Sequence, residues 1–194
     1  GSGLVGSEMC IRDRRYRVTD NLVSDMISTV EAESPDILLL GAGPRFMTDG
    51  EKSMTSFFGL FRKKVDDVLE HASCPVAIFV NRDYRNGDEV AVLINGSMDS
   101  FLFTYVRRLL EDGGSFIHLY YFSSGSEEYV GQIYKINKQY ANRVHLYPLV
   151  EIEDLVLPII HGLLILSYDT CVGIAANEKV FKALPSLLVM KDAS

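Results

Sequence analysis

The stretch from residue 89 to 111 constrains the fold most strongly, because it passes from a buried strand through a glycine turn into an amphipathic helix. The run VAVLI at residues 90–94 is apolar at every position, which is typical of a strand covered on both faces of a parallel sheet. Asn95, Gly96 and Ser97 interrupt the run with turn-forming residues. Apolar residues then recur at helical spacing up to Leu110, and a second apolar run follows at residues 115–122. The pattern predicts a β-α-β unit.

The remaining apolar runs extend this alternation of strands and helices along the chain. The sequence predicts an α/β fold with an open parallel sheet flanked by helices. The expected strands are residues 36–40, 76–80, 89–94, 116–122, 143–148, 163–166 and 186–190. The expected helices are residues 20–33 with Thr19 or Asp20 as the cap, 58–72, 100–110, 127–140 capped by Ser126, 151–160 and 173–184.

The two parts of the chain end in the same order of elements, which indicates an internal repeat. The first part ends with a helix, the segment DILLLGAG, a loop, a second helix and the segment CPVAIFVNRD. The second part ends with the same order of elements, in which GLLILSYD corresponds to DILLLGAG and PSLLVMKD corresponds to CPVAIFVNRD. The polar residues 81–88 separate the parts. We therefore expect residues 15–83 to be the C-terminal half of one α/β module and residues 88–192 to be a complete second module.

Residues 1–14 are expected to lie outside the natural protein. Gly1, Ser2 and Gly3 form a linker-like start, and LVGSEMCIRDR at residues 4–14 resembles the translation of a sequencing adapter. Such segments are left out of fold reasoning. The natural sequence is then expected to begin near Arg15 and to extend upstream, and Cys10 carries no chemical role.

Composition excludes several classes of function. The net charge of −7 offers no basic footprint for nucleic acid, so no nucleic-acid partner is expected. No apolar run reaches the ~18 residues of a membrane span. Three cysteines without a paired motif point to a reducing cytoplasm. The spacing of the four histidines predicts neither a histidine cluster nor a metal site, and Cys74 is expected to be buried.

Two stretches of the first part resemble the universal stress protein family. They are DILLLG at residues 36–41 and VLEHASCPV at residues 68–76, and the likeness extends over residues 19–192. The resemblance implies that residues 76–80 lie beside residues 187–190 across a pseudo-twofold axis. It also implies a homodimer through the last strands. A first module without its front half would expose a sheet edge and an apolar face, which predicts lowered stability or self-association.

The junction ASCPVAIFVNR at residues 72–82, followed by VAVLINGSMD at 90–99, more narrowly resembles the cytosolic C-terminal region of monovalent cation:proton antiporters. This resemblance implies a non-catalytic regulatory domain of a Na⁺ or K⁺:proton antiporter, cytoplasmic and tethered to the inner face of the membrane. Its partner would be the transmembrane antiporter domain of the same protein, with no cofactor. One alternative is a soluble tandem stress protein that binds ATP or another adenine nucleotide. A second is an ATP pyrophosphatase-type enzyme.

Candidate ligand residues lie where predicted strands end, because ligands of open α/β sheets bind at the carboxyl ends of the strands. The first part offers Gly41 and Gly43, whose spacing departs from the phosphate loop of ATP-binding stress proteins. The second part offers Ser167 as a candidate at the end of a predicted strand, although that phosphate loop is missing there as well. The stretch NGSMDS at residues 95–100 resembles the pyrophosphate loop of ATP pyrophosphatases, which makes Asn95, Gly96, Ser97 and Asp99 further candidates. The alternative role of Ser97 or Asp99 is to cap the next helix.

Overall fold

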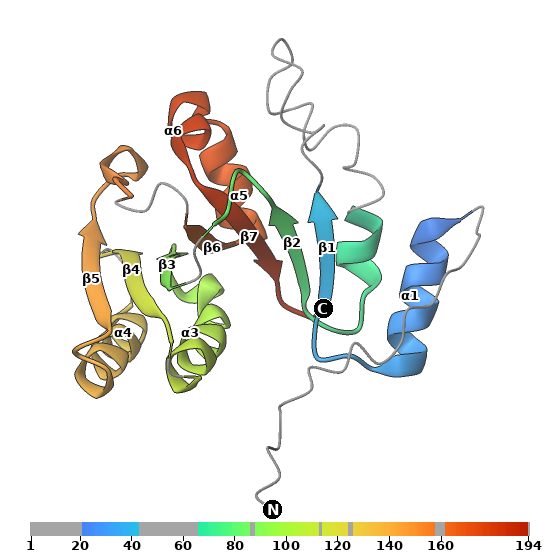
Figure 1. The fold of residues 1–194 in the computed structure, drawn as a ribbon, viewed down its shortest axis with the longest axis horizontal. Helices are drawn as coiled ribbons and strands as arrows, with labels where there is room; N and C mark the ends of the chain where they lie inside the picture. The colour runs from blue at the N-terminus through green and yellow to red at the C-terminus, as the bar shows by residue number, and fades with distance from the viewer. Residues whose placement is uncertain are drawn as a thin grey trace, which may run out of the picture.

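Seven strands form one sheet in the order β1-β2-β7-β6-β3-β4-β5 (Figure 1). The computed structural model describes residues 21–42, 66–85, 88–112, 114–123, 126–157 and 162–193. All neighbouring strands run parallel except β2 and β7, which are antiparallel. The strands are β1 (Leu38–Ala42), β2 (Val76–Val80), β3 (Glu89–Ile94), β4 (Phe116–Phe122), β5 (Val144–Leu149), β6 (Leu163–Ser167) and β7 (Ser186–Lys191). The predicted α/β fold with a largely parallel sheet is confirmed.

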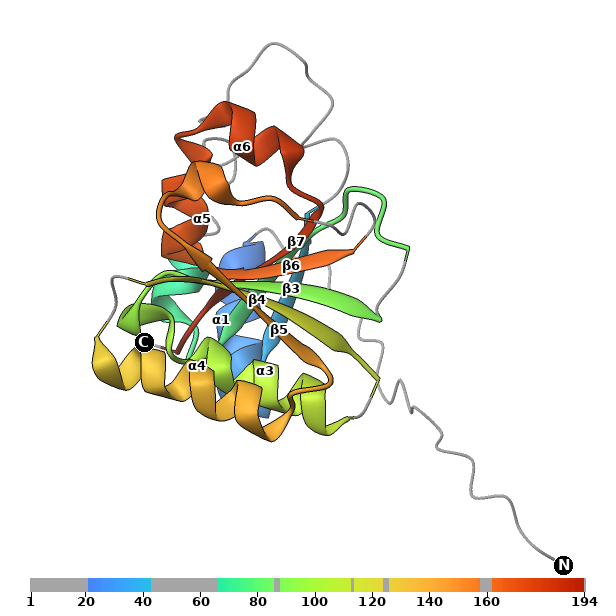
Figure 2. The same cartoon turned by 90° about the vertical axis from the view of Figure 1, so that its left-hand side faces the viewer.

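Helices cover both faces of this sheet. Helices α3 and α4 lie against one face, and α5 and α6 lie against the other (Figure 2). The helices are α1 (Leu22–Glu33), α3 (Leu102–Glu111), α4 (Glu127–Gln139), α5 (Tyr168–Ala175) and α6 (Glu178–Ala183), with 3₁₀ turns η2 (Ser97–Asp99) and η3 (Ile152–Asp154). Residues 66–71 are also helical. The predicted helix at 58–72 is therefore described only in its second half, and residues 1–20 and Gly43 lie outside the described residues.

The antiparallel pair β2 and β7 joins the N-terminal part (residues 21–85) to the C-terminal part (residues 88–193). Ile78 pairs with Val189, and Val80 pairs with Leu187. This confirms the predicted pairing of residues 76–80 with residues 187–190. Both strands use both of their edges inside the chain, so a homodimer would need a different surface.

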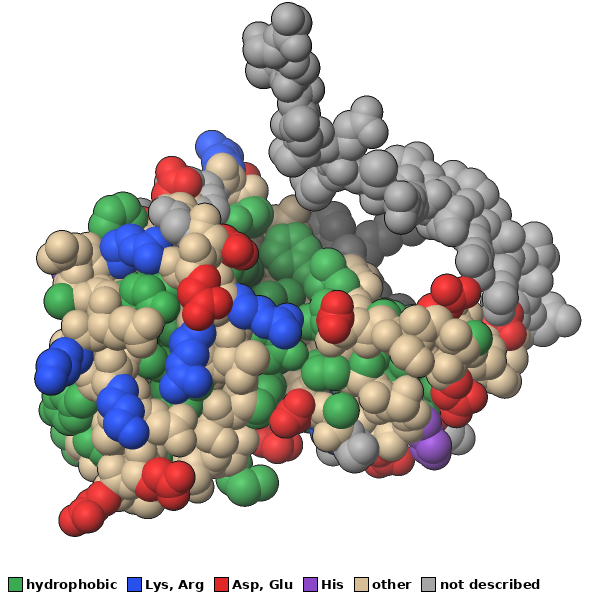
Figure 3. All heavy atoms as spheres, turned by 90° about the horizontal axis from the view of Figure 1, so that it is seen from below, with side chains coloured by type: hydrophobic (Ala, Val, Ile, Leu, Met, Phe, Trp, Pro, Cys, Tyr) green, Lys and Arg blue, Asp and Glu red, His purple; other side chains and the backbone are tan. Residues whose placement is uncertain are grey.

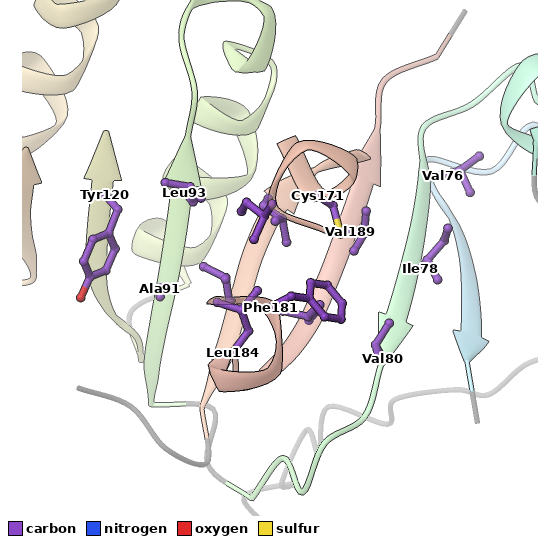
Figure 4. Close-up of a cluster of buried hydrophobic side chains, with 14 of the residues drawn as sticks. Val76, Ile78, Val80, Ala91, Leu93, Tyr120, Cys171, Phe181, Leu184 and Val189 are labelled. Carbon is purple, nitrogen blue, oxygen red and sulfur yellow. The ribbon is translucent and has the colours of Figure 1, made fainter. Parts of the chain in front are cut away.

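One layer of buried side chains crosses this junction (Figure 4). Val76, Ile78 and Val80 of β2 pack in the same cluster as Val189 of β7 and Phe181 of α6. The cluster continues to Tyr120 of β4. Because the N-terminal and C-terminal parts share this apolar layer, neither part has a separate core on that face.

Arg82 ties the end of β2 to helix α6. Its Nη1 donates to the carbonyl oxygens of Phe181 at 2.7 Å and Leu184 at 3.0 Å. Its guanidinium carbon lies 4.4 Å from the centre of the Phe181 ring. The backbone N–H of Arg82 also donates to the Ser186 hydroxyl at 2.8 Å. The guanidinium therefore donates to two carbonyls at the C-terminal end of α6, where helix carbonyls lack a full set of intrahelical donors.

A second contact between the two parts joins helix α5 to the helical residues 66–71. The Tyr168 hydroxyl donates to the Asp66 carboxylate at 2.8 Å. Together with Arg82, this bond fixes the N-terminal part against the helices as well as against the sheet.

The predicted helix at residues 151–160 is wrong. Only η3 forms, because Glu151 and Asp154 make reciprocal capping bonds that close a single turn. Leu155 is already extended, with φ −69° and ψ 97°. Residues 158–160 lie outside the described residues. The segment instead continues as an extended crossover. In it the Val156 carbonyl accepts a hydrogen bond from the Tyr120 hydroxyl at 3.0 Å.

Two further helix boundaries differ from the prediction. The single helix expected at residues 173–184 is two, because α5 begins directly after β6 and Asn177 caps a new helix by accepting from Val180 N–H. Helix α1 is capped by Asn21, which accepts from Ser24 N–H at 3.3 Å, and not by Thr19 or Asp20. Ser126 caps α4 as predicted.

The N-terminal part exposes apolar surface, as predicted. The Leu39 side chain on β1 is 62% exposed, and Leu22 on α1 and Ile37 are also exposed. Among the described residues, β1 pairs only with β2, so its outer edge has no strand beside it. Self-association stays a prediction.

We expect Arg82→Met to lower the free energy of unfolding by about 2 kcal/mol, because two carbonyls at the end of α6 lose a charged donor. Chemical denaturation measures this change. Arg85→Met is the matched control, since Arg85 is exposed and pairs only locally with Asp83, and exposed pairs contribute about 0–1 kcal/mol. Equal effects of the two substitutions would contradict the role of Arg82.

Candidate functional site

The candidate site lies at the carboxyl ends of β3 and β6, where the order of the sheet reverses. From β3 the chain proceeds through β4 to β5 on one side, and then returns to β6 and β7 on the other. In open α/β sheets this reversal leaves a crevice for ligands. Here the turn at residues 95–99 follows β3, and the first turn of α5 follows β6.

Asp99 bridges the two sides of this crevice. Its side chain is only 3% exposed. Its Oδ2 accepts the backbone N–H of Asn95 at 2.8 Å and the hydroxyl of Thr170 at 2.9 Å. The first bond closes the turn after β3, and the second joins that turn to helix α5. The crevice is therefore spanned by a buried carboxylate.

The predicted capping role of Ser97 or Asp99 is wrong. Helix α3 begins at Leu102, and its N-cap Phe101 makes no side-chain capping bond. Ser97 and Asp99 instead belong to the 3₁₀ turn η2. The turn can take this shape because Gly96 adopts φ 93°, a conformation that residues with a β-carbon rarely adopt.

The strand ends around Asp99 are held by neighbouring hydroxyls. The Tyr129 hydroxyl of α4 donates to the Ile94 carbonyl at 2.9 Å, and burial raises the pKa of Tyr129 to about 12. Ser167 caps α5 by accepting the Thr170 N–H at 3.1 Å. Thr170 thus donates its backbone N–H to Ser167 and its hydroxyl to Asp99.

This arrangement differs from a phosphate-binding loop. Such a loop leaves several backbone N–H groups free to point at the anion. Here the N–H groups of Asn95 and Thr170 already donate to side chains of the protein. The Asp99 carboxylate adds an acceptor at the place where an anionic ligand needs donors.

The structure brings together five of the seven predicted site residues. Asn95, Gly96, Ser97 and Asp99 form the turn after β3, and Ser167 ends the neighbouring strand β6. Gly41 lies apart on β1. Because β2 and β7 are antiparallel, the carboxyl end of β1 is at the opposite end of the sheet from that of β6. Thr170 is the partner that the sequence did not single out, and only its place three residues after Ser167 hinted at it.

Two histidines do lie together, against the prediction that none would. His118 of β4 and His145 of β5 are register partners, with ring centres 5.8 Å apart. One nitrogen of His118 lies 3.7 Å from the Glu89 carboxylate, and the other lies 3.2 Å from the Tyr147 hydroxyl. Sequence spacing cannot reveal this pair, because it depends on the register of β4 and β5. His71 lies elsewhere, on the helical residues 66–71.

Burial lowers the pKa of His118, which neighbouring Glu89 partly opposes and His145 reinforces. Within the described part of the chain, no group of three or more His, Cys, Asp or Glu side chains is arranged to hold a metal ion.

Both described cysteines are buried, as expected for Cys74. Burial raises the pKa of Cys171 to about 12, and it also raises the pKa of Cys74. A thiolate is the reactive form of cysteine, so these two thiols are poor nucleophiles at neutral pH.

Acidic and basic side chains are interspersed on the face seen in Figure 3, without a continuous basic surface among the residues coloured there. None of the helices in the described ranges has the length and apolar character needed to cross a bilayer.

The fold is similar to that of universal stress proteins. A universal stress protein from Archaeoglobus fulgidus superposes with a TM-score of 0.56 and 15% identity, over 89% of this chain and 66% of that one. A protein of unknown function from Pseudomonas aeruginosa gives a TM-score of 0.53 and 14% identity, over 90% and 69% of the two chains. The chain thus spans about two thirds of the length of these structures. No family model matches the sequence, and no curated protein does.

We expect Asp99→Ala to lower the free energy of unfolding by about 2–3 kcal/mol, since a buried charged acceptor is lost and two donors are left unpaired. Thr170→Val should cost about 1 kcal/mol. A double-mutant cycle in urea measures their coupling. Exposed Ser97→Ala, within about 0.5 kcal/mol of the parent, is the control in the same turn. Additive effects at Asp99 and Thr170 would contradict the bridge.

We expect the unfolding free energy to fall as the pH drops from about 7.5 to 5.5. The folded state lowers the pKa of His118 below the ordinary value of about 6.5. The unfolded state therefore binds the proton more readily, so acid favours unfolding. His118→Gln should flatten this slope in denaturant titrations across that range. An unchanged slope in His118→Gln would count against this account.

Proposed function

We propose that this chain is a non-catalytic regulatory module of the stress-protein fold, which acts through contacts with another protein domain. The hydrogen bond between Asp99 and Thr170 carries the proposal, because it spans the crevice in which this type of sheet binds ligands. A site whose own carboxylate and hydroxyl satisfy each other is built for holding two elements together more than for turnover.

The chemistry of Asp99 also argues against an ATP pyrophosphatase. In such an enzyme the aspartate would help to hold magnesium, and the turn would grip pyrophosphate. Here Oδ2 of Asp99 accepts from Asn95 and Thr170, and the side chain is buried. Metal binding through Oδ2 would compete with both bonds, and the buried side chain would have to become accessible.

The setting that we propose is the cytosolic region of a monovalent cation:proton antiporter, with Na⁺ or K⁺ as the transported cation. The support is the sequence at residues 72–82 and 90–99, whose junction is the informative part of the likeness to that family. The partner would be the transmembrane domain of the same protein, which would tether this module to the inner face of the membrane. Regulation would then consist of different affinities of the module for two states of the transport domain.

A soluble tandem stress protein that binds an adenine nucleotide is the second candidate. The fold comparison favours it, since one structural neighbour is named a universal stress protein. For ATP to occupy the crevice after β3, the Asp99 to Thr170 bond would have to open, so binding at this place should depend strongly on both residues.

Isothermal titration with ATP, AMP and cyclic dinucleotides distinguishes the candidates. We expect no saturable heat from the folded parent chain, because the crevice is spanned by Asp99. Thr170→Val, which removes the bond but keeps the shape of the side chain, is the matched variant. Saturable binding to the parent whose affinity changes in Asp99→Ala and in Thr170→Val would favour the nucleotide-binding stress protein. Conversion of ATP to AMP and pyrophosphate would favour the enzyme.

The antiporter setting has a separate test. The natural gene upstream of the codon for Arg15 should encode apolar spans of about 20 residues each. A complete natural gene without such spans would overturn this setting and leave the soluble stress protein.

A further inference from the structure

A groove separate from the Asp99 crevice lies between helix α3 and the ends of three strands. We call it the α3 groove. Its volume is about 510 Å³, within the range of about 300–1,000 Å³ that small-molecule sites in proteins occupy. Asp36, Pro75 and Asp192 line one side of it, and the outward side of α3 lines the other. Neither Asp99 nor its partner on α5 is among the lining residues.

The residues on the sheet side stand in a row because their strands are neighbours. Asp36 precedes β1, Pro75 precedes β2, and Asp192 follows β7. Lys191, just before Asp192, pairs with Val76, just after Pro75. Figure 1 shows the C-terminal end of the chain beside the lower ends of β1 and β2. The two carboxylates therefore flank Pro75, and the N-terminal and C-terminal parts each supply one of them.

Polar side chains at helical spacing form the opposite side. Ser100, Thr104 and Arg108 follow at intervals of four residues, so they lie along one stripe of α3 and the turn before it. The stripe is about 12 Å long, at about 1.5 Å per residue. Tyr105 and Gln132 of α4 also line the groove. This side thus offers hydroxyls, a phenol, an amide and a guanidinium.

The charged side chains of the α3 groove are one cation and two anions, namely Arg108, Asp36 and Asp192. All three are exposed, and none of them forms an ion pair with another residue in the described part of the chain. The Asp192 carboxylate accepts the Ala193 N–H at 3.0 Å, a bond within its own loop. The groove therefore has a single net negative charge at neutral pH, with its cation and anions on opposite sides.

Tyr105 connects the cation with one of the anions. Burial raises the pKa of Tyr105, the Asp192 carboxylate raises it further, and the Arg108 guanidinium lowers it. Both charges therefore act on the same phenol. A partly buried aromatic ring thus stands between a guanidinium and a carboxylate, where it can contact the methylene carbons of a ligand that spans them.

We propose that the α3 groove binds a basic amino acid, a molecule with one carboxylate and two cationic groups such as lysine or arginine. Its carboxylate binds Arg108, since a guanidinium donates two parallel bonds to a carboxylate. Its two cationic groups bind Asp36 and Asp192. The single net positive charge of the ligand balances the net charge of the groove. This site is independent of the proposed function, which rests on Asp99.

Two simpler ligand classes match the groove less well. A phosphate or another polyanion would lie beside two carboxylates, and like charges at short range repel. A diamine without a carboxylate would leave Arg108 unpaired and would add a like charge beside it. A molecule that carries both kinds of charge satisfies all three side chains.

Isothermal titration with lysine, arginine and their analogues tests the proposal. Cadaverine and agmatine lack the carboxylate of lysine and arginine, and norleucine and citrulline lack the charge at the end of the side chain. We expect saturable binding of lysine or arginine, and at least about tenfold weaker binding of the two analogues of the amino acid that binds, since each loses a charged contact. Binding should also raise the melting temperature of the chain.

Substitutions in the groove assign the contacts. Arg108→Gln should remove the preference for the amino acid over its analogue without a carboxylate. Asp36→Asn and Asp192→Asn should each weaken binding of the amino acid by at least about tenfold. Arg107→Gln is the matched control, because Arg107 is exposed on the same helix and does not line the groove. The substituted side chains are exposed, so each variant should keep the melting temperature of the ligand-free parent.

Three results would overturn the proposal. One is the lack of saturable binding of either amino acid to the folded parent up to about 10 mM. Another is equal affinity for an amino acid and its analogue without a carboxylate. The third is an effect of Arg107→Gln as large as that of Arg108→Gln.

Discussion

The antiparallel pairing of β2 with β7 is the contact on which the rest of the structure depends. The N-terminal part contributes only two described strands, and a two-stranded unit is marginally stable by itself. Its β2 gains a full ladder with β7 and a place in the apolar layer around Val189. Arg82 and Tyr168 then fix helices of the two parts to each other. The N-terminal part is consequently ordered by the C-terminal part.

Where the strand order of the sheet reverses, the buried polar side chains form hydrogen bonds within the chain. The Asp99 carboxylate accepts from the Asn95 N–H and the Thr170 hydroxyl, and Ser167 accepts from the Thr170 N–H, so these buried polar groups bond to one another. Burying a carboxylate is costly unless it is hydrogen-bonded. The two hydrogen bonds of Asp99 therefore join β3 to α5 and favour one arrangement of these two elements.

Much of the fold was predictable from the sequence, and the exceptions have physical reasons. All seven strands were found, since each is an apolar run between turn-forming residues, and the pairing of β2 with β7 followed from the family likeness. The helix expected at 151–160 failed because apolar spacing alone cannot distinguish a helix from an extended crossover under a sheet. The predicted order of strands and helices was enough to assign candidate residues to the loops that follow β3 and β6. The partnership of Asp99 with Thr170 and the pair of His118 with His145 depend on register and on three-dimensional proximity, which spacing along the chain does not encode.

Because β2 and β7 are antiparallel, the strands of the two parts have their carboxyl ends at opposite sides of the sheet, which we call its two poles. Strands β1 and β2 end at one pole, and β3 to β7 end at the other, about 17 Å away for strands of five residues. The loops that follow β1 and β2 therefore lie at the opposite pole from the loops that follow β3 to β7. A partner held at one pole leaves the other pole free for a second partner. The β2 and β7 ladder is where the two directions meet, since it is the one antiparallel pairing among the described strands.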